Sequence, residues 1–207
     1  ALMTRTCLRP IPTGKINKKQ ALIFGIFLSI FSVSALYYYS NFLSAFLLFF
    51  TIAFYLFVYT MWLKRKTSQN IVIGGIAGSL PPVIGWTIST NSISFVSISM
   101  FLIIFFWTPS HFWALSLYKA DDYKKAKIPM MPITDGSEKT KLYILIYSLL
   151  MLPVVILPYA INFSGLIYLI PTIVLTLYYN FICIDLYKYE KNKFDLKKAK
   201  KVFAYSI

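Results

Sequence analysis

The sequence predicts an all-α membrane protein with six complete transmembrane helices and the start of a seventh. The 207 residues are 58% hydrophobic and 14% charged, whereas soluble domains are about 45–50% apolar and about 25% charged. The apolar residues form runs of about 20, which is long enough to cross a ~30 Å hydrocarbon core as helices. Lipid cannot satisfy backbone polar groups, so such runs form helices or closed barrels. Strict alternation of apolar and polar residues is absent, which favours helices.

Short polar or basic interruptions separate the first three predicted spans. A basic loop over 1–19, broken by Pro10, Pro12 and Gly14, precedes the first span at 20–39. Ser40 and Asn41 separate it from the second span at 42–62. The basic loop 63–70 then leads to the third span, which contains several glycines and the Pro81–Pro82 pair. This third span covers 71–89.

The remaining spans follow the same pattern with longer loops. The break at 90–92 leads into the fourth span at 93–118, and the longest loop covers 119–141. The last two complete spans are expected at 142–160 and 166–184, and Asn162 to Gly165 separate them. A charged loop at 185–201 precedes an apolar stretch at 202–207, which we interpret as the first turns of a seventh span.

The basic residues test this topology. All 21 Lys and Arg fall in the loops 1–19, 63–70, 119–141 and 185–201, and none falls in the three short breaks between them. The seven acidic residues lie in the same four loops. Cytoplasmic loops carry the excess of Lys and Arg in membrane proteins. The long loops are therefore expected in the cytoplasm, or in the corresponding matrix compartment.

The net charge of +14 has two open explanations. Cytoplasmic loops are basic for topology and for contact with anionic lipid. A basic mouth could also attract an anionic substrate such as a diphosphate. Nucleic acid is not an expected partner, because the charge is spread over loops between membrane spans. Cys7 and Cys183 lie far apart and show no metal-binding spacing, so they predict neither a disulfide nor a thiol site.

The stretch 105–132 contains the sharpest candidate residue, His111, which is the only histidine of the chain. Ionisable side chains inside membrane spans are costly and usually face a cavity or a partner. A neutral imidazole can ligate haem or metal or carry a proton. The alternative is a histidine that hydrogen-bonds to a neighbouring helix for packing. Pro109 removes one helical hydrogen bond and predicts a kink beside His111.

Helical spacing relates His111 to residues near the end of the fourth span. If the helix continued, Asp122 would lie about 16 Å along the axis and about 20° around it from His111, with Tyr118 close to the same stripe. Asp121 and Asp122 are carboxylates of the kind that bind Mg²⁺ together with phosphate oxygens. The alternative for both is a solvated loop with lysine counterions.

Two further groups have a functional and a structural interpretation. Arg5 and Arg9 have planar guanidinium groups suited to phosphate oxygens, but they also fit as topology charges. The small residues around Gly74 and Gly75 predict close helix packing. The aromatic residues near His111 are mostly expected to pack in the bundle, although some could stabilise a carbocation through their ring faces.

Four segments carry a resemblance to a known family. They are MTRTCLRPIPTG at 3–14, YTMWLKRKTSQNIVIGGIAGSLPPVIGW at 59–86, FWTPSHFWALSLYKADDYKKAKIPMMP at 106–132 and KKAKKVFAYS at 197–206. In order and spacing, the chain resembles the protohaem IX farnesyltransferases, or haem O synthases, of the UbiA-type intramembrane prenyltransferase superfamily. The likeness spans nearly the whole chain.

The resemblance implies a nine-helix bundle around a cavity open to the cytoplasm, with 1–207 as a single prenyltransferase domain truncated at both ends. It implies transfer of a farnesyl group from farnesyl diphosphate to the 2-vinyl group of haem B, with addition of water, to give haem O and diphosphate. Mg²⁺ would hold the diphosphate. The expected location is the bacterial inner membrane, and haem A synthase or a terminal-oxidase assembly would be further partners besides the lipid bilayer.

The resemblance also assigns roles to individual residues. Arg5 and Arg9 would bind diphosphate or a haem propionate and act in catalysis, and Lys64 and Arg65 are weaker candidates for the same binding. His111 would be a haem ligand or a base, and Tyr118 would contact substrate. The metal ligands would be Asp121 and Asp122.

The chain departs from the family pattern at two points. The first acidic motif, Asn-x-x-x-Asp-x-x-x-Asp, is absent and is expected before Ala1, together with the first two helices. No acid follows Asp121 or Asp122 after four residues, which weakens the second metal site. We therefore expect residues 1–207 to be inactive alone. The alternatives are a related prenyltransferase with an aromatic acceptor and a non-catalytic transport or assembly subunit.

Overall fold

Every regular element of the computed structural model is a helix. The structure describes residues 6–188 and 196–207, and within these residues it contains no strand. Six helical segments are long and apolar enough to cross a membrane, in agreement with the six predicted spans. These segments are Lys18–Tyr39, Phe42–Arg65, Asn70–Thr90, Phe95–Tyr118, Ser137–Ala160 and Leu166–Lys188. The predicted fold class is confirmed, and the protein is a multi-pass membrane protein.

The short polar breaks between spans also start the helices that follow them. Helix α1 (Lys18–Tyr39) begins with a capping box in which Asn17 and Gln20 bond each other's backbone N–H groups. Helix α2 (Phe42–Ala53) begins at Asn41, whose Oδ1 accepts from the Ser44 N–H at 2.9 Å. Such side chains satisfy backbone donors that have no partner within a helix. These two caps therefore fix where the first and second spans begin.

The second and third spans are less regular than predicted. After α2 the chain continues as a π-helix, η2 (Phe54–Trp62), and ends in a 3₁₀ turn, η3 (Leu63–Arg65). The third span consists of α3 (Asn70–Ser79) and α4 (Pro81–Thr90). Prolines at the first positions of α4 lack the N–H groups that would have continued the hydrogen-bond ladder of α3.

The predicted loop 119–141 contains helical structure. Helix α5 (Phe95–Tyr118) ends before Lys119, whose φ of −115° and ψ of 23° interrupt the helix. The short helices α6 (Ala120–Lys125) and α7 (Met131–Thr134) follow, and α8 (Ser137–Ala160) begins before the predicted residue 142. The helix that carries His111 therefore does not continue to Asp122, and the two residues do not share one helical stripe.

The C-terminal part also differs from the prediction. Helix α9 (Leu166–Lys188) forms the sixth span and extends past the predicted end at residue 184. Helix α10 (Leu196–Tyr205) begins within the predicted charged loop. Ala199 and Val202 on α10 are fully buried, whereas Lys200 is exposed. The helix is therefore amphipathic. Its lysine-rich first part was expected as loop, and the apolar stretch from residue 202 was expected as the start of a seventh span, whereas the structure joins the two parts in one helix.

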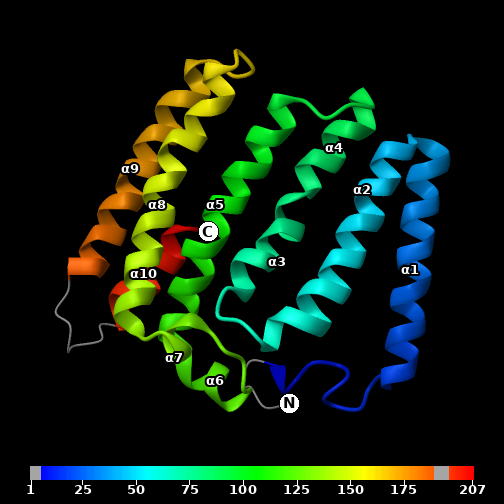
Figure 1. Cartoon of the computed structure of the whole chain (residues 1–207), viewed down its shortest axis with the longest axis horizontal. Coiled ribbons are helices and arrows are strands. Elements are labelled where there is room, and N and C mark those ends of the chain that lie inside the picture. The colour runs from blue at the N-terminus through cyan, green and yellow to red at the C-terminus, as the bar shows by residue number, and fades with distance from the viewer. Residues whose placement is uncertain (1–5, 189–195) are drawn as a thin grey trace.

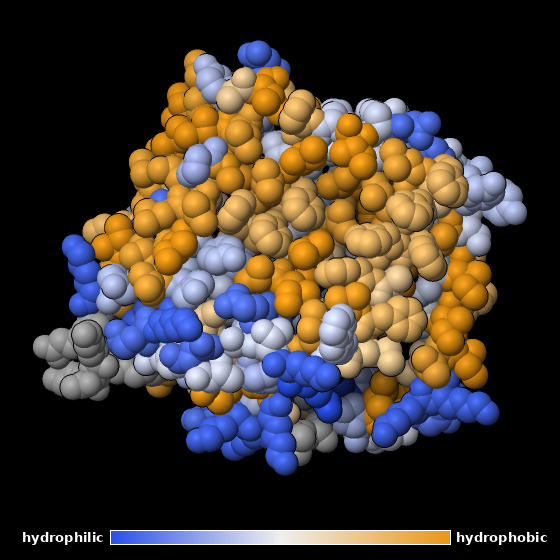
Figure 2. Space-filling view, in the orientation of Figure 1, coloured by the Kyte–Doolittle hydropathy of each residue, from blue (hydrophilic) through white to orange (hydrophobic). Residues whose placement is uncertain are grey.

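The membrane-crossing helices follow one another across the molecule in chain order, from α1 at one edge to α9 at the other (Figure 1). The largest buried cluster lies where α5, α8, α9 and α10 meet, and Trp113, Ile144 and Cys183 within it are fully buried. Helix α1 packs mainly on α2 and has no buried residue. Figure 2 shows a broad apolar surface above a hydrophilic lower edge, where α6, α7 and the N-terminal segment lie.

Candidate functional site

A cavity of about 590 Å³ lies among η2, α3, α5 and the segment that joins α6 to α7. The N-terminal segment also reaches it through Thr6 and Arg9. Its size falls within the range of small-molecule sites, which is about 300–1,000 Å³. The described residues that line it include no acid, and they are Thr6, Arg9, Tyr55, Tyr59, Lys64, Asn70, Ile71, Gly74, Gly75, Gly78, Ile104, Trp107, Thr108, Phe112, Tyr123, Ile128 and Met130.

The basic residues of the cavity come from two separate segments of the chain. Arg9 lies in the N-terminal segment, and Lys64 lies in the 3₁₀ turn at the end of the second span. The Lys64 ammonium lies over the ring of Tyr59, 5.5 Å from the ring centre. A cation in this position is attracted by the negative face of the ring. Tyr59 thus helps to hold Lys64 at the cavity.

Asn70 connects two segments at the same end of the cavity. It is 1% exposed, and its Nδ2 donates to the carbonyl of Lys64 at 3.3 Å and to that of Pro129 at 3.4 Å. Buried polar groups need such partners. Asn70 therefore ties the turn that carries Lys64 to the segment between α6 and α7.

The wall of the cavity is apolar and aromatic, and one close backbone approach shapes it. A Cβ at Gly74 would lie 2.7 Å from Cε2 of Tyr59, so only glycine allows the tyrosine ring to lie against α3. The rings of Tyr55 and Tyr59 are 5.0 Å apart, and both come from the π-helix η2. Such π-helical turns are rare and occur often at functional sites.

His111 lies beside the cavity and contacts α10. Its Nδ1 is 2.6 Å from the hydroxyl of Ser206, and its ring stacks between Trp107 and Phe203 at centroid distances of 4.4 and 4.6 Å. The residue is 7% exposed and is not among those that line the cavity. Its neighbours Trp107 and Phe112 do line it. His111 is therefore one side chain away from the cavity wall.

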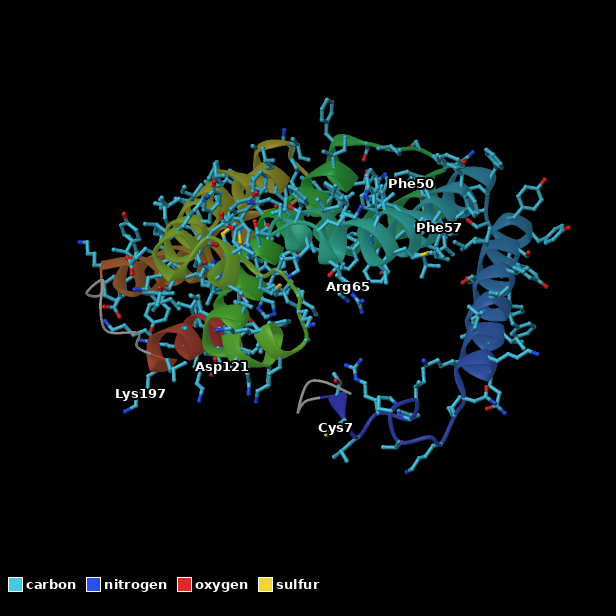
Figure 3. All side chains as sticks on the ribbon, turned by 60° about the horizontal axis from the view of Figure 1, so that its bottom comes forward. Cys7, Phe50, Phe57, Arg65, Asp121 and Lys197 are labelled. Carbon is cyan, nitrogen blue, oxygen red and sulfur yellow. The ribbon has the colours of Figure 1, made fainter. Side chains whose placement is uncertain are left out.

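The other predicted residues lie around the same end of the molecule without lining the cavity. Tyr118 packs edge-on against Phe203. Arg65 is exposed, and Figure 3 shows it pointing away from the helices toward the side where Cys7 and the N-terminal segment lie. Asp121 lies on α6, and Lys197 lies on α10. Both are at the bottom of the helices in the view of Figure 3. Arg5 lies outside the described residues.

The carboxylates on their own do not enclose a metal ion. Within residues 6–188 and 196–207, no group of three or more His, Cys, Asp or Glu side chains is placed to hold one. Asp121 and Asp122 are neighbours on a six-residue helix, so their side chains point about 100° apart. The structure thus brings together Arg9 and Lys64 from the predicted set, but it leaves the predicted metal ligands outside the cavity.

Sequence reasoning missed several polar residues of the cavity, among them Tyr59, Asn70 and Tyr123. Tyr59 looked like one aromatic residue among many in an apolar span. Asn70 was expected in a loop, whereas the structure places it at the first residue of α3. Tyr123 follows the two predicted metal ligands, and it is 9% exposed. Its role depends on the turn at Lys119, which no local pattern predicted.

Comparison with known proteins agrees with this architecture. The model of the UbiA prenyltransferase family matches residues 1–207. The chain belongs to the UbiA prenyltransferase family. A protein of Pelagibacter ubique named protoheme IX farnesyltransferase is 72% identical over 207 residues, which are 100% of this chain and 68% of that protein.

Two further UbiA-family relatives with the same name are more distant. The protein of Rickettsia bellii is 50% identical over 100% of this chain and 68% of its own length. That of Parvibaculum lavamentivorans is 46% identical over 100% of this chain and 65% of its own length. The chain therefore spans about two thirds of the curated relatives it matches. No solved structure matches the chain.

Proposed function

We propose that the protein transfers the farnesyl group of farnesyl diphosphate to the 2-vinyl group of haem B and so makes haem O. The observation that carries this proposal is the amphiphilic cavity, in which Arg9 and Lys64 face the same space as an aromatic, acid-free wall. Such a cavity suits a substrate with an anionic head and a long apolar tail. The names of the relatives supply the acceptor.

The proposed reaction breaks the allylic C–O bond of farnesyl diphosphate, and the electron pair leaves with the diphosphate. The vinyl π electrons then form the new C–C bond, water adds to the remaining carbon of the vinyl group, and one proton is released. Arg9 and Lys64 would stabilise the negative charge on the leaving oxygen. The faces of Tyr55 and Tyr59 would stabilise the allylic cation, and the apolar wall would limit its reaction with water.

Several parts of this proposal rest on the resemblance. Mg²⁺ would neutralise the diphosphate when bound, with Asp121 and Asp122 as the carboxylates that this chain contributes. These two residues on their own do not enclose an ion in the described part of the chain. His111 would serve as haem ligand or base, and Arg5, Arg65 and Tyr118 would contact substrate.

The location and partners belong to the same proposal. We place the protein in the bacterial inner membrane with its long basic loops in the cytoplasm, because those loops carry all 21 Lys and Arg. Haem O would pass from it to haem A synthase or to a terminal-oxidase assembly. Residues 1–207 would form one prenyltransferase domain within a nine-helix bundle.

The decisive experiment measures haem O in membranes that contain the full protein, haem B, farnesyl diphosphate and Mg²⁺. Lys64→Met removes a charge from the cavity and should raise KM for farnesyl diphosphate about 10-fold or more, since charge-assisted hydrogen bonds contribute about 1.5–3 kcal/mol. Lys66→Gln, an exposed neighbour outside the cavity lining, also removes one positive charge. It is the control and should keep the native KM.

Two outcomes would count against the proposal. If Lys64→Met and Lys66→Gln had the same kinetics, the cavity would not be the diphosphate site. If the membranes prenylated an aromatic acceptor in place of haem B, the acceptor would be wrong and the related prenyltransferase activity would replace it.

A further inference from the structure

The hydroxyl of Ser206 contacts two groups whose hydrogen-bonding abilities differ. Its Oγ is 2.6 Å from the carbonyl oxygen of Phe203 and 2.6 Å from Nδ1 of His111. A carbonyl oxygen can only accept, whereas a neutral imidazole nitrogen either donates or accepts according to its tautomer. These two contacts therefore constrain where the protons lie.

The single hydroxyl hydrogen of Ser206 must point to Phe203. Two oxygen atoms 2.6 Å apart with no hydrogen between them would repel each other through their lone pairs, and the carbonyl of Phe203 supplies no hydrogen. The Ser206 oxygen then meets His111 with a lone pair. The short contact between the two side chains requires that Nδ1 of His111 carries the hydrogen and donates it.

We infer that Ser206 holds neutral His111 in the Nδ1–H tautomer and leaves Nε2 unprotonated. Within the described residues, the structure gives Nε2 no hydrogen-bond partner. The Nε2 lone pair can then accept a proton. The opposite tautomer would present an N–H there and could not. Ser206 is a positioning residue, because it acts through His111.

The surrounding contacts also keep the imidazole ring from turning over. Trp107 and Phe203 stack on its two faces with interplanar angles of 21° and 28°. The indole Nε1 of Trp107 donates to the backbone carbonyl of Ser206 at 2.8 Å, which fixes the end of α10 relative to α5. A flipped ring would place a C–H group against the Ser206 oxygen and lose the hydrogen bond.

The tautomer is measured directly by NMR of the full protein in lipid nanodiscs with ¹⁵N-labelled histidine. His111 is the only histidine in residues 1–207, and a difference spectrum against His111→Gln isolates its signals from any others. The expected spectrum shows a protonated Nδ1 and an unprotonated Nε2 at neutral pH. A protonated Nε2 in the native protein would overturn the inference.

Variants of Ser206 test whether its hydroxyl causes the preference. Ser206→Ala should lose it and give a mixture of tautomers, whereas Ser206→Thr keeps a hydroxyl at the same place and should retain the native spectrum. An unchanged Nδ1–H population in Ser206→Ala would assign the preference to another cause. The spectrum of the native protein decides the tautomer even if a variant fails to fold.

The link to catalysis rests on the proposed function and has its own readout. Loss of the group that orients a functional histidine typically costs 10–100-fold in affinity or activity. Ser206→Ala should therefore lower kcat about 10-fold or more with KM for farnesyl diphosphate unchanged, and Ser206→Thr should restore it. If the native protein shows the Nδ1–H tautomer but makes no haem O, the proposed function fails and the inference about Ser206 stands.

Discussion

Gly74 lies against the ring of Tyr59 on the wall of the cavity, and the ring occupies the space that a side chain at position 74 would need. Gly78 also lines the cavity, but an added Cβ there would meet nothing within 4 Å. The two glycines lie one turn apart on the same helix, α3. They therefore form a matched pair in which only the contact with Tyr59 differs.

We predict opposite effects of alanine at these two positions. Gly74→Ala forces the ring of Tyr59 to move and should lower stability by about 1–3 kcal/mol, as overpacking does. Gly78→Ala should raise stability by up to about 1 kcal/mol, because alanine favours the helix. Thermal unfolding in nanodiscs measures both, and equal melting temperatures would contradict the role of Tyr59. Tyr59→Ala in the Gly74→Ala background should recover part of the loss.

Asp135 offers a residue whose charge state depends on its local partners. It accepts hydrogen bonds from Lys139 at 2.9 Å and from Thr134 at 2.8 Å. These bonds, the one from Lys139 most of all, lower the pKa of Asp135 from 3.8 to about 2. The lowered pKa means that ionised Asp135 stabilises the start of α8 above about pH 4.

We predict that this stabilisation disappears as the pH falls from about 4 through 2, because the folded state then binds the proton that the unfolded state binds first. Lys139→Met should move the pKa of Asp135 back toward about 3.9. Carboxyl ¹³C titration of labelled aspartate, assigned with Asp135→Asn, measures both values. A pKa near 4 in the native protein would contradict the hydrogen bonds described above.

Residues that carry chemistry were only partly predictable from the sequence. Arg9 and Lys64 were found because charged residues beside apolar spans stand out from their surroundings. Tyr59 and Asn70 were missed, since their role depends on contacts with Gly74 and Pro129 that lie 15 and 59 residues away. A contact of this kind has no local signature.

Helix α10 is the element whose packing most directly affects the site. Its Ala199 and Val202 are buried against α5 and α9. Phe203 in its last turn and Ser206 directly after it contact His111. The helix itself is only ten residues long. An isolated helix of that length is marginal in water, so its docking must supply most of its stability.

We predict that Ala199→Leu disturbs His111 from a distance. Ala199 is 0% exposed, and added methyl groups in a packed site typically cost 1–3 kcal/mol. Undocking of α10 should broaden or shift the ¹⁵N signals of His111 and lower activity. Ala204→Leu makes the same substitution on the exposed face of α10 and is the control, expected to leave the histidine spectrum unchanged. Native signals in Ala199→Leu would show that α10 docks independently of this contact.

Elements built from apolar runs were predicted well, and those built from mixed sequence were not. The six spans follow from length and composition alone, because lipid tolerates little else. The helices α6 and α7 and the first part of α10 were expected as loops, because α6 and α10 are rich in charged residues and α7 has only four residues, one of them a proline. Their helical state depends on the faces they bury, as Tyr123, Met131 and Val202 do.

At the scale of the whole molecule, the charge distribution predicts the orientation in the membrane. We propose Ser92→Cys and Lys125→Cys, each in a Cys7→Ser background, as probes of the two ends. Both positions are exposed, and Cys183, the other cysteine of residues 1–207, is 0% exposed. A membrane-impermeant maleimide added to intact cells should label Ser92→Cys at once and Lys125→Cys only after permeabilisation. The reverse pattern would overturn the cytoplasmic placement of the basic loops.

Because the basic residues are concentrated in the loops of one predicted side, the free energy of the orientation depends on the membrane potential. Carrying one elementary charge through a potential of 100 mV requires about 2.3 kcal/mol, so moving the net charge of +14 requires about 30 kcal/mol. In a cell whose interior is negative, the membrane potential that respiration maintains would itself favour this orientation. Once inserted, the molecule could not turn over while that membrane remained energised.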